Sequence, residues 1–203
     1  SESGVPIFAI RGDLAMKLSA FALAAALASP ASAVMVVNGS FETGDFDGWT
    51  QVGDSSFDFV TTQVAGGGPT DGVWHAAFGS TDPGGGGVTQ TVDTVAGGLY
   101  TLRFDLAQLG GNPNAYGVFW DGGFLDVFDD VEAFDYRSFS LNVRASGSST
   151  EMGFVFYSLP SFYLLDNVSL TVIPEPATWA MLIAGFGVVG LSLRRSRTAT
   201  EPA

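Results

Sequence analysis

Residues 100–106 read Tyr-Thr-Leu-Arg-Phe-Asp-Leu, and this stretch decides the fold class. Apolar side chains occupy its even positions, and polar side chains occupy its odd positions. Successive side chains of a β-strand point to opposite faces, so a period of two buries one face and leaves the other in water. The stretch therefore predicts a strand that covers a hydrophobic core on one side.

The same signal recurs along residues 34–172. Clusters of Gly, Pro, Asn and Asp separate the apolar segments, as turns do in antiparallel sheets. The pattern predicts an all-β domain, an antiparallel β-sandwich. The expected strands are 34–37, 57–63, 73–78, 88–95, 99–109, 116–120, 124–128, 134–143, 152–157 and 163–173.

The charge of this domain is strongly negative. Residues 34–172 contain three Arg, no Lys and seventeen Asp and Glu, which gives a net charge of −14. Such a surface repels phosphate backbones, so we expect no nucleic-acid partner. The chain has no Cys, which excludes disulfides and thiolate metal sites.

Residues 16–33 follow the three-part pattern of a secretory signal peptide. A short basic start, an apolar run and the small residues 31–33 follow one another in the order that signal peptidase requires. A buried N-terminal helix is the alternative. Because residues 1–15 contain no Met and no pattern, we expect translation to begin at Met16 and the exported protein to begin at Val34.

Residues 174–197 combine a short motif, an apolar run and a basic end. Residues 177–193 carry no charge, and as a helix they would be about 26 Å long at 1.5 Å per residue. That length is the lower limit for crossing a bilayer, so we predict a transmembrane helix here. The basic end would stay in the cytoplasm and the β domain would lie outside the inner membrane.

This tail resembles the PEP-CTERM sorting signal. The residues that carry the resemblance are Pro174, Glu175, Pro176, Trp179, Arg194, Arg195 and Arg197. The resemblance implies that an exosortase, a membrane-embedded cysteine protease, cleaves the tail and passes the protein to the cell surface or extracellular space. A plain membrane anchor is the alternative, because a short span followed at once by Arg fits it equally.

The two ends of the β domain carry a second resemblance. Residues 38–42 read Asn-Gly-Ser-Phe-Glu, and residues 164–170 read Leu-Leu-Asp-Asn-Val-Ser-Leu. Together they are similar to the galactose-binding-like jelly rolls of carbohydrate-binding modules. The resemblance implies a jelly-roll sandwich whose N- and C-terminal strands pair.

It also implies a structural calcium ion held by Glu42 and Asp166. Calcium takes six to eight oxygen ligands, and backbone carbonyls such as that of Gly39 would complete the set. The alternative is that both carboxylates contact backbone amides.

Aromatic rings could form a platform for sugars, whose apolar C–H faces stack on them. The candidate rings are Trp74, Tyr116, Phe119, Trp120, Tyr136, Phe156, Tyr157, Phe162 and Tyr163. We prefer Trp120 beside Asp121, and Tyr116 beside Asn114, because the polar neighbours could bond sugar hydroxyls. The alternative for each ring is the core, since half the side chains of an alternating strand point inward.

We expect no catalytic residues. The chain has one His, His75, and no nucleophile-elbow pattern. The acidic stretch 121–135 is interpreted as a solvated rim, with a weak cation site as its more plausible functional use. The sequence therefore predicts an exported, non-enzymatic surface or biofilm-matrix protein that binds polysaccharide. A structural or adhesion protein without a defined ligand is the alternative.

Overall fold

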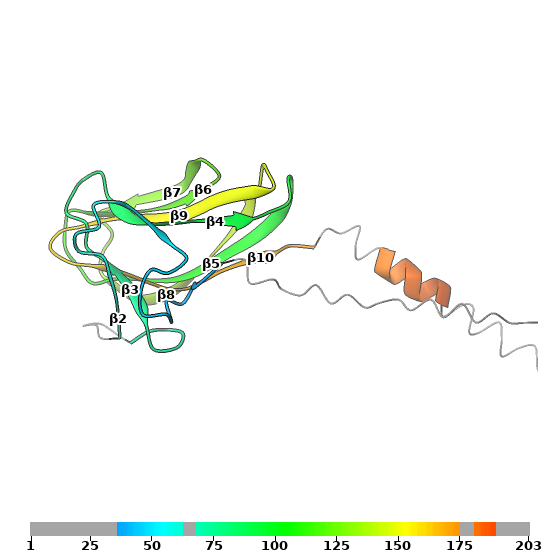
Figure 1. Ribbon diagram of the computed structural model, residues 1–203, viewed down its shortest axis with the longest axis horizontal. Helices are drawn as coiled ribbons and strands as arrows, with labels where there is room; N and C mark the ends of the chain where they lie inside the picture. The colour runs from blue at the N-terminus through cyan, green and yellow to red at the C-terminus, as the bar shows by residue number, and fades with distance from the viewer. Residues whose placement is uncertain (1–35, 63–67, 175–180, 190–203) are drawn as a thin grey trace, which may run out of the picture. The chain divides into compact units, whose positions relative to one another are not determined.

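The computed structural model describes residues 36–62, 68–174 and 181–189 (Figure 1). The predicted signal peptide at 16–33 and the N-terminal residues 1–15 lie outside this part of the chain. Most of the sorting tail lies outside it too, so its predicted cleavage and membrane span stay predictions.

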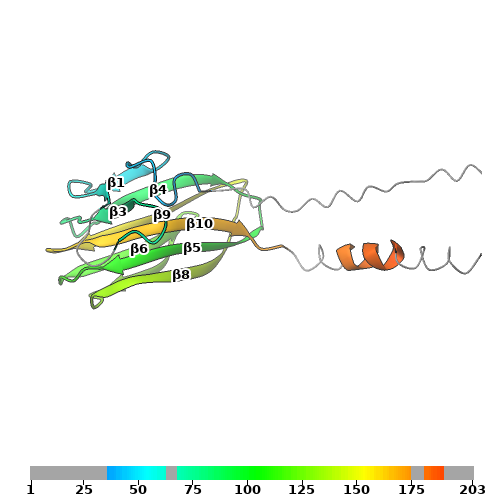
Figure 2. The ribbon, with the colours of Figure 1, turned by 90° about the horizontal axis from the view of Figure 1, so that it is seen from below.

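Two five-stranded antiparallel sheets make up the β domain (Figures 1 and 2). Sheet I has the order β1-β4-β9-β6-β7, and sheet II has the order β2-β3-β10-β5-β8. The strands of sheet I are β1 (Thr50–Gly53), β4 (Gly86–Asp93), β9 (Ser149–Ser158), β6 (Asn114–Trp120) and β7 (Gly123–Asp129). Those of sheet II are β2 (Phe59–Thr61), β3 (His75–Phe78), β10 (Tyr163–Val172), β5 (Leu99–Gln108) and β8 (Phe134–Arg144). The predicted antiparallel sandwich is confirmed.

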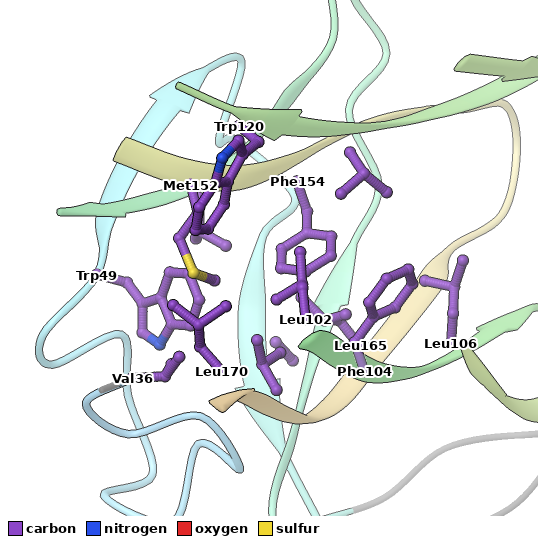
Figure 3. Close-up of a cluster of buried hydrophobic side chains, with 14 of the residues drawn as sticks. Val36, Trp49, Leu102, Phe104, Leu106, Trp120, Met152, Phe154, Leu165 and Leu170 are labelled. Atoms are coloured by element: carbon purple, nitrogen blue, oxygen red, sulfur yellow. The ribbon is translucent and has the colours of Figure 1, made fainter. Parts of the chain in front are cut away.

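The core lies between the sheets, as the alternation in β5 predicts. Tyr100, Leu102, Phe104 and Leu106 are all at most 2% exposed. The Phe104 ring meets Phe154 of sheet I edge to face, with centroids 4.9 Å apart (Figure 3). Burying each such side chain contributes about 1.5–3 kcal/mol, so this layer supplies much of the stability.

The N-terminal part of the domain departs from the prediction. Residues 36–48, of which 36–37 were expected in a strand, form successive turns and bends. Asn38 has a φ of 51°, and its side-chain amide donates to Thr43 Oγ1 and to the carbonyls of Asp45 and Asp47. The Asn38 side chain thus supplies hydrogen bonds that hold the turn segment together, in place of pairing with a neighbouring strand.

The predicted pairing of the N- and C-terminal strands is wrong. The first strand, β1, pairs with β4 in sheet I, whereas β10 lies between β3 and β5 in sheet II. The turn segment makes the contact instead, because the Val168 amide donates to the Gly39 carbonyl over 2.9 Å. A Cβ on Gly39 would lie 2.0 Å from the Val168 carbonyl oxygen, so only glycine allows this approach.

Residues 181–189 form a short helix with every residue exposed. Within the described ranges, no helix combines the length and the apolar character needed to cross a bilayer. The predicted span, 177–193, extends beyond the described residues at both ends.

Candidate functional site

The side chains preferred for sugar binding do not form an exposed platform. Trp120 and Tyr116 are each 5% exposed and Asn114 is 2% exposed. All three share the inward face of β6 with Val118, and Figure 3 shows Trp120 among the core side chains. The prediction is wrong because it weighed polar neighbours above the two-residue period of the strand.

These residues hold the sandwich together instead. The Trp120 indole N–H donates to the Arg144 carbonyl over 2.9 Å, which ties sheet I to the end of β8. Asp121 occupies the turn after β6 and accepts the Ser146 amide at 2.9 Å. The Trp120 indole N–H and the Asp121 carboxylate thus have hydrogen-bond partners within the protein, and no ligand is needed to explain why they lie side by side.

Asn114 and Tyr116 are structural in the same way. The Asn114 side chain donates to the carbonyls of Gly111 and Val131, and its carboxamide oxygen accepts the Tyr163 hydroxyl. The Tyr116 ring stacks on Phe128 with centroids 4.7 Å apart. Asn114 is therefore a structural side chain, whereas Tyr116, although 5% exposed, is among the residues that line two surface cavities.

The opposite face of the same strand carries a hollow. Ala115, Gly117 and Phe119 occupy the alternate positions of the strand, on the face away from the core, where Ala115 and Phe119 are partly exposed and Gly117 is buried. A cavity of about 210 Å³, which we call the sheet I cavity, opens on this face over β6, β7 and β9. Its lining includes Pro83, Gly84, Gly85, Ala115, Gly117, Phe124, Val127, Asp129, Val155 and Tyr157.

Small residues make the floor of the sheet I cavity. A Cβ on Gly117 would lie 2.8 Å from the Phe124 ring, so the ring rests directly on the glycine. Gly85, with a φ of +78°, approaches Val155 in the same manner. The floor is therefore flat backbone, and larger side chains rise around it.

Exposed apolar groups make the walls. Phe124 is 55% exposed and Val127 is 51% exposed, and the pairing of β7 with β6 shifts register between them. The Phe124 ring is held edge to face against Phe119, with centroids 5.8 Å apart. Tyr157 adds a partly exposed ring from β9, and Asp129 adds an exposed carboxylate.

Sequence reasoning missed most of this site. Tyr157 was among the candidate rings, and Asp129 belongs to the acidic stretch interpreted as a solvated rim with a weak cation site, but Phe124 and Val127 were not singled out. The available signal was the parity of β6, in which Ala115 and Gly117 share the face opposite Tyr116, Val118 and Trp120. Small residues on an outward face leave room for a side chain of a neighbouring strand, and the Phe124 ring occupies that room over Gly117.

The predicted calcium residues lie at a different place, against residues 70–74. Asp166 is fully buried, and its Oδ2 accepts the Thr70 amide at 2.6 Å, the Thr70 hydroxyl at 3.0 Å and the Asp71 amide at 3.0 Å. Its Oδ1 accepts the Asn167 amide at 2.7 Å. Burial raises the pKa of Asp166, and these hydrogen bonds oppose the rise.

Glu42 holds the other end of the same segment. Its Oε1 accepts the amides of Val73 and Trp74, each at 2.8 Å. A Cβ on Gly72 would lie 2.2 Å from the Glu42 carboxyl carbon, so the carboxylate closes over a glycine. Glu42 and Asp166 together fix a segment that is far from both in sequence.

The donor set fits calcium only in part. Each of the three expected ligands, Glu42, Asp166 and the Gly39 carbonyl, already accepts N–H groups, and a cation would have to share these oxygens. No group of three or more His, Asp or Glu side chains that could hold a metal occurs in the described ranges. The contacts match the alternative of carboxylates bound to amides, and calcium stays a prediction.

His75 is a buried side chain of β3. Its Nδ1 lies 2.9 Å from the Tyr136 hydroxyl, and burial lowers the pKa of its imidazole. The acidic stretch lies elsewhere, on β7, the following turn and the start of β8, where most of its carboxylates are exposed. It forms a solvated rim, as interpreted from the sequence.

Comparison with known families identifies the tail. Residues 172–197 match the family described as the PEP-CTERM protein-sorting motif, so the predicted sorting motif is confirmed. No curated protein matches the chain.

Solved structures identify the fold of the β domain. TmCBM61 in complex with β-1,4-galactotriose is similar with a TM-score of 0.52 and 20% identity, over 69% of this chain and 99% of that one. The tandem CBM22 domains of Paenibacillus barcinonensis Xyn10C give 0.52 and 15%, over 69% and 46%. A CBM22 xylan-binding domain gives 0.50 and 14%, over 69% and 96%. At these identities the likeness shows the fold, a jelly-roll sandwich of the carbohydrate-binding-module type.

Proposed function

We propose that this exported protein binds polysaccharide, without catalysis, on the outer face of sheet I. The observation that carries the proposal is the sheet I cavity, where Phe124 and Tyr157 stand over a glycine floor. The shared fold of carbohydrate-binding modules supports it.

The chemistry of the cavity suits a sugar ring. The apolar C–H face of a pyranose packs on aromatic and aliphatic side chains, which Phe124 and Val127 supply. Tyr157 adds a ring with a polar end, and Asp129 adds a hydrogen-bond acceptor at the edge. Ligand sites commonly combine such apolar walls with a few polar groups that fix orientation.

The sorting motif supports a site of action outside the cytoplasm. A PEP-CTERM motif at residues 172–197 implies export and processing by an exosortase. We propose that the protein is held transiently in the inner membrane by its tail and then reaches the cell surface or biofilm matrix. There an exopolysaccharide would be its partner.

Glycan binding by protein recovered from the cell surface tests the proposal. Tyr157→Ala and Phe124→Ala should each weaken binding about tenfold, because truncating a ring that anchors a ligand costs more than about 1 kcal/mol. Phe59→Ala is the matched control, since Phe59 is 44% exposed but lies on sheet II. Absence of binding to every glycan would instead favour a structural or adhesion protein of the matrix.

A further inference from the structure

We infer that the glycan held in the sheet I cavity carries free amino groups, as a partly N-deacetylated amino-sugar polymer does. The inference rests on the proposed function and names the class of its ligand. It follows from the charge of the cavity and of the surface around it.

The sheet I cavity contains one charged side chain, and that side chain is negative. Asp129 ends β7 at the edge of the hollow, and every other lining residue is uncharged. The Asp129 carboxylate is exposed, so a ligand group can reach it. A cavity of this kind offers an acceptor to a cation and repels an anion.

The three arginines of the domain lie elsewhere. Arg103 lines a separate cavity on sheet II. Arg144 donates to the Gly97 carbonyl over 2.7 Å, and the Arg137 guanidinium lies 4.9 Å from the centre of the Phe134 ring. Residues 34–172 contain no Lys, and none of the three arginines lines the sheet I cavity.

Further carboxylates strengthen the negative potential there. Asp130 follows Asp129 directly, and Asp126 lies on the same strand. Burial raises the pKa of the Tyr163 hydroxyl, and the nearby Asp129 and Asp130 carboxylates add to the rise. The field of such exposed carboxylates extends over about 10 Å of solution at 0.1 M salt.

An ammonium group on a sugar satisfies this arrangement. It would donate a charge-assisted hydrogen bond to Asp129 while the sugar ring packs on the aromatic walls. Cations also interact favourably with the faces of aromatic rings such as Phe124 and Tyr157. A uronic-acid polymer would bring like charges together, and a neutral polymer would leave Asp129 without a cationic partner.

The test compares one polymer in two chemical states. Protein recovered from the cell surface is titrated with chitosan oligosaccharides, with the same oligosaccharides after full N-acetylation, and with polygalacturonate. We expect the free-amine form to bind at least tenfold more tightly than the acetylated form, with the preference falling as NaCl is raised. Polygalacturonate should not bind.

Two variants separate the inference from the proposed function. Asp129→Asn should abolish the preference for the free amine, whereas Tyr157→Ala should weaken both forms. Asp93→Asn, an exposed acid at the far end of β4, is the matched control and should change neither. Equal or tighter binding of the acetylated or uronic-acid polymer, or an unchanged preference in Asp129→Asn, overturns the inference alone. Failure to bind any glycan overturns the proposed function.

Discussion

The outer faces of the two sheets are built from similar strands and end up in opposite states. On sheet II, Ala77, Ala107 and Leu164 point away from the core and are still at most 2% exposed, because Leu109, Tyr136 and Phe162 pack on them. On sheet I, the corresponding surface leaves Phe124 and Val127 about half exposed. Alternation alone therefore does not decide which outward face meets solvent.

The residues that cover sheet II come from strands and from one loop. Leu109 follows β5, Tyr136 lies on β8 and Phe162 precedes β10. The lining of the sheet I cavity comes from strands and one glycine-rich turn. One outer face is thus covered by side chains of the domain itself, and the other carries the proposed glycan site.

The largest expected effect is the loss of stability when a buried contact on sheet II is removed. Asp166→Ala removes the acceptor of four hydrogen bonds at a fully buried position. We expect a loss of about 3–4 kcal/mol in the free energy of unfolding, because buried donors are left without partners. Urea denaturation measures it, with Asp93→Ala as an exposed control that should change stability by less than about 0.5 kcal/mol. A loss below about 1 kcal/mol would show that segment 70–74 is held by other contacts.

Calcium would sharpen the same comparison by stabilising the covered face further. An ion that binds only the folded state adds about 2.7 kcal/mol at a hundredfold excess over its Kd. We expect Ca²⁺ to raise the melting temperature above that in chelator, and to do so more than Mg²⁺, which prefers smaller octahedral sites. Glu42→Gln keeps an acceptor for the Val73 and Trp74 amides but loses the charge, so it should abolish the response. Identical melting curves with and without chelator would show that the Glu42 and Asp166 carboxylates bind backbone amides and no calcium ion.

Substitutions on the outer face of sheet I should weaken glycan binding and hardly change the free energy of unfolding. In Gly117→Ala the new methyl group would lie 2.8 Å from the Phe124 ring, which is exposed and can move aside. We expect glycan affinity to fall about tenfold, or about 1.4 kcal/mol, while the free energy of unfolding changes by less than about 1 kcal/mol. Gly123→Ala is the control, because its Cβ would meet open space. A large loss of stability in Gly117→Ala would contradict the distinction between the faces.

The smallest effect concerns Asp58, which precedes β2 of sheet II. Burial raises its pKa to about 6, the Gly79 amide opposes the rise, and the charge of Asp54 adds to it. The folded state therefore holds a proton that the unfolded state has released, and stability falls as the pH rises from about 4 to about 6. Asp58→Asn should remove this dependence and gain about 1 kcal/mol at pH 7, after allowance for partial exposure of the side chain. Parallel stability curves of wild type and variant across this range would contradict it.

The fold could be predicted because turns and strands have local signatures. Nine of the ten expected strands occur in the structure, marked by apolar segments, several of them alternating, between clusters of turn-forming residues. The missed strand, Thr50–Gly53, has one apolar residue, and its partner β4 supplies the pairing. The turns at residues 36–48 were not predicted, because the apolar residues of this segment follow no strand or helix period and each packs between turns.

The sequence suggested a site built on aromatic rings, but it did not show on which face of the sheet each ring lies. Tyr116 and Trp120 differ from Phe119 by parity alone, and parity relative to the core depends on the partner strands. The covering of sheet II left a clearer signal, because Leu164 and Leu165 are consecutive and apolar where an open strand would alternate. The residues that cover sheet II, such as Tyr136 and Phe162, come from other parts of the chain, so no local sequence pattern shows which face is covered.

The position of β10 has a mechanical consequence. The sorting motif begins where this strand ends, at Val172, and β10 lies in the middle of sheet II, paired with β5 along most of its length and with β3. If the processed C-terminus remains attached at the cell surface, force on a bound ligand is transmitted to the domain through the end of β10. Such a pull shears both hydrogen-bond ladders at once, whereas a pull on an edge strand opens one ladder bond by bond. We expect the tether point to make this domain resistant to force, whatever its stability in still solution.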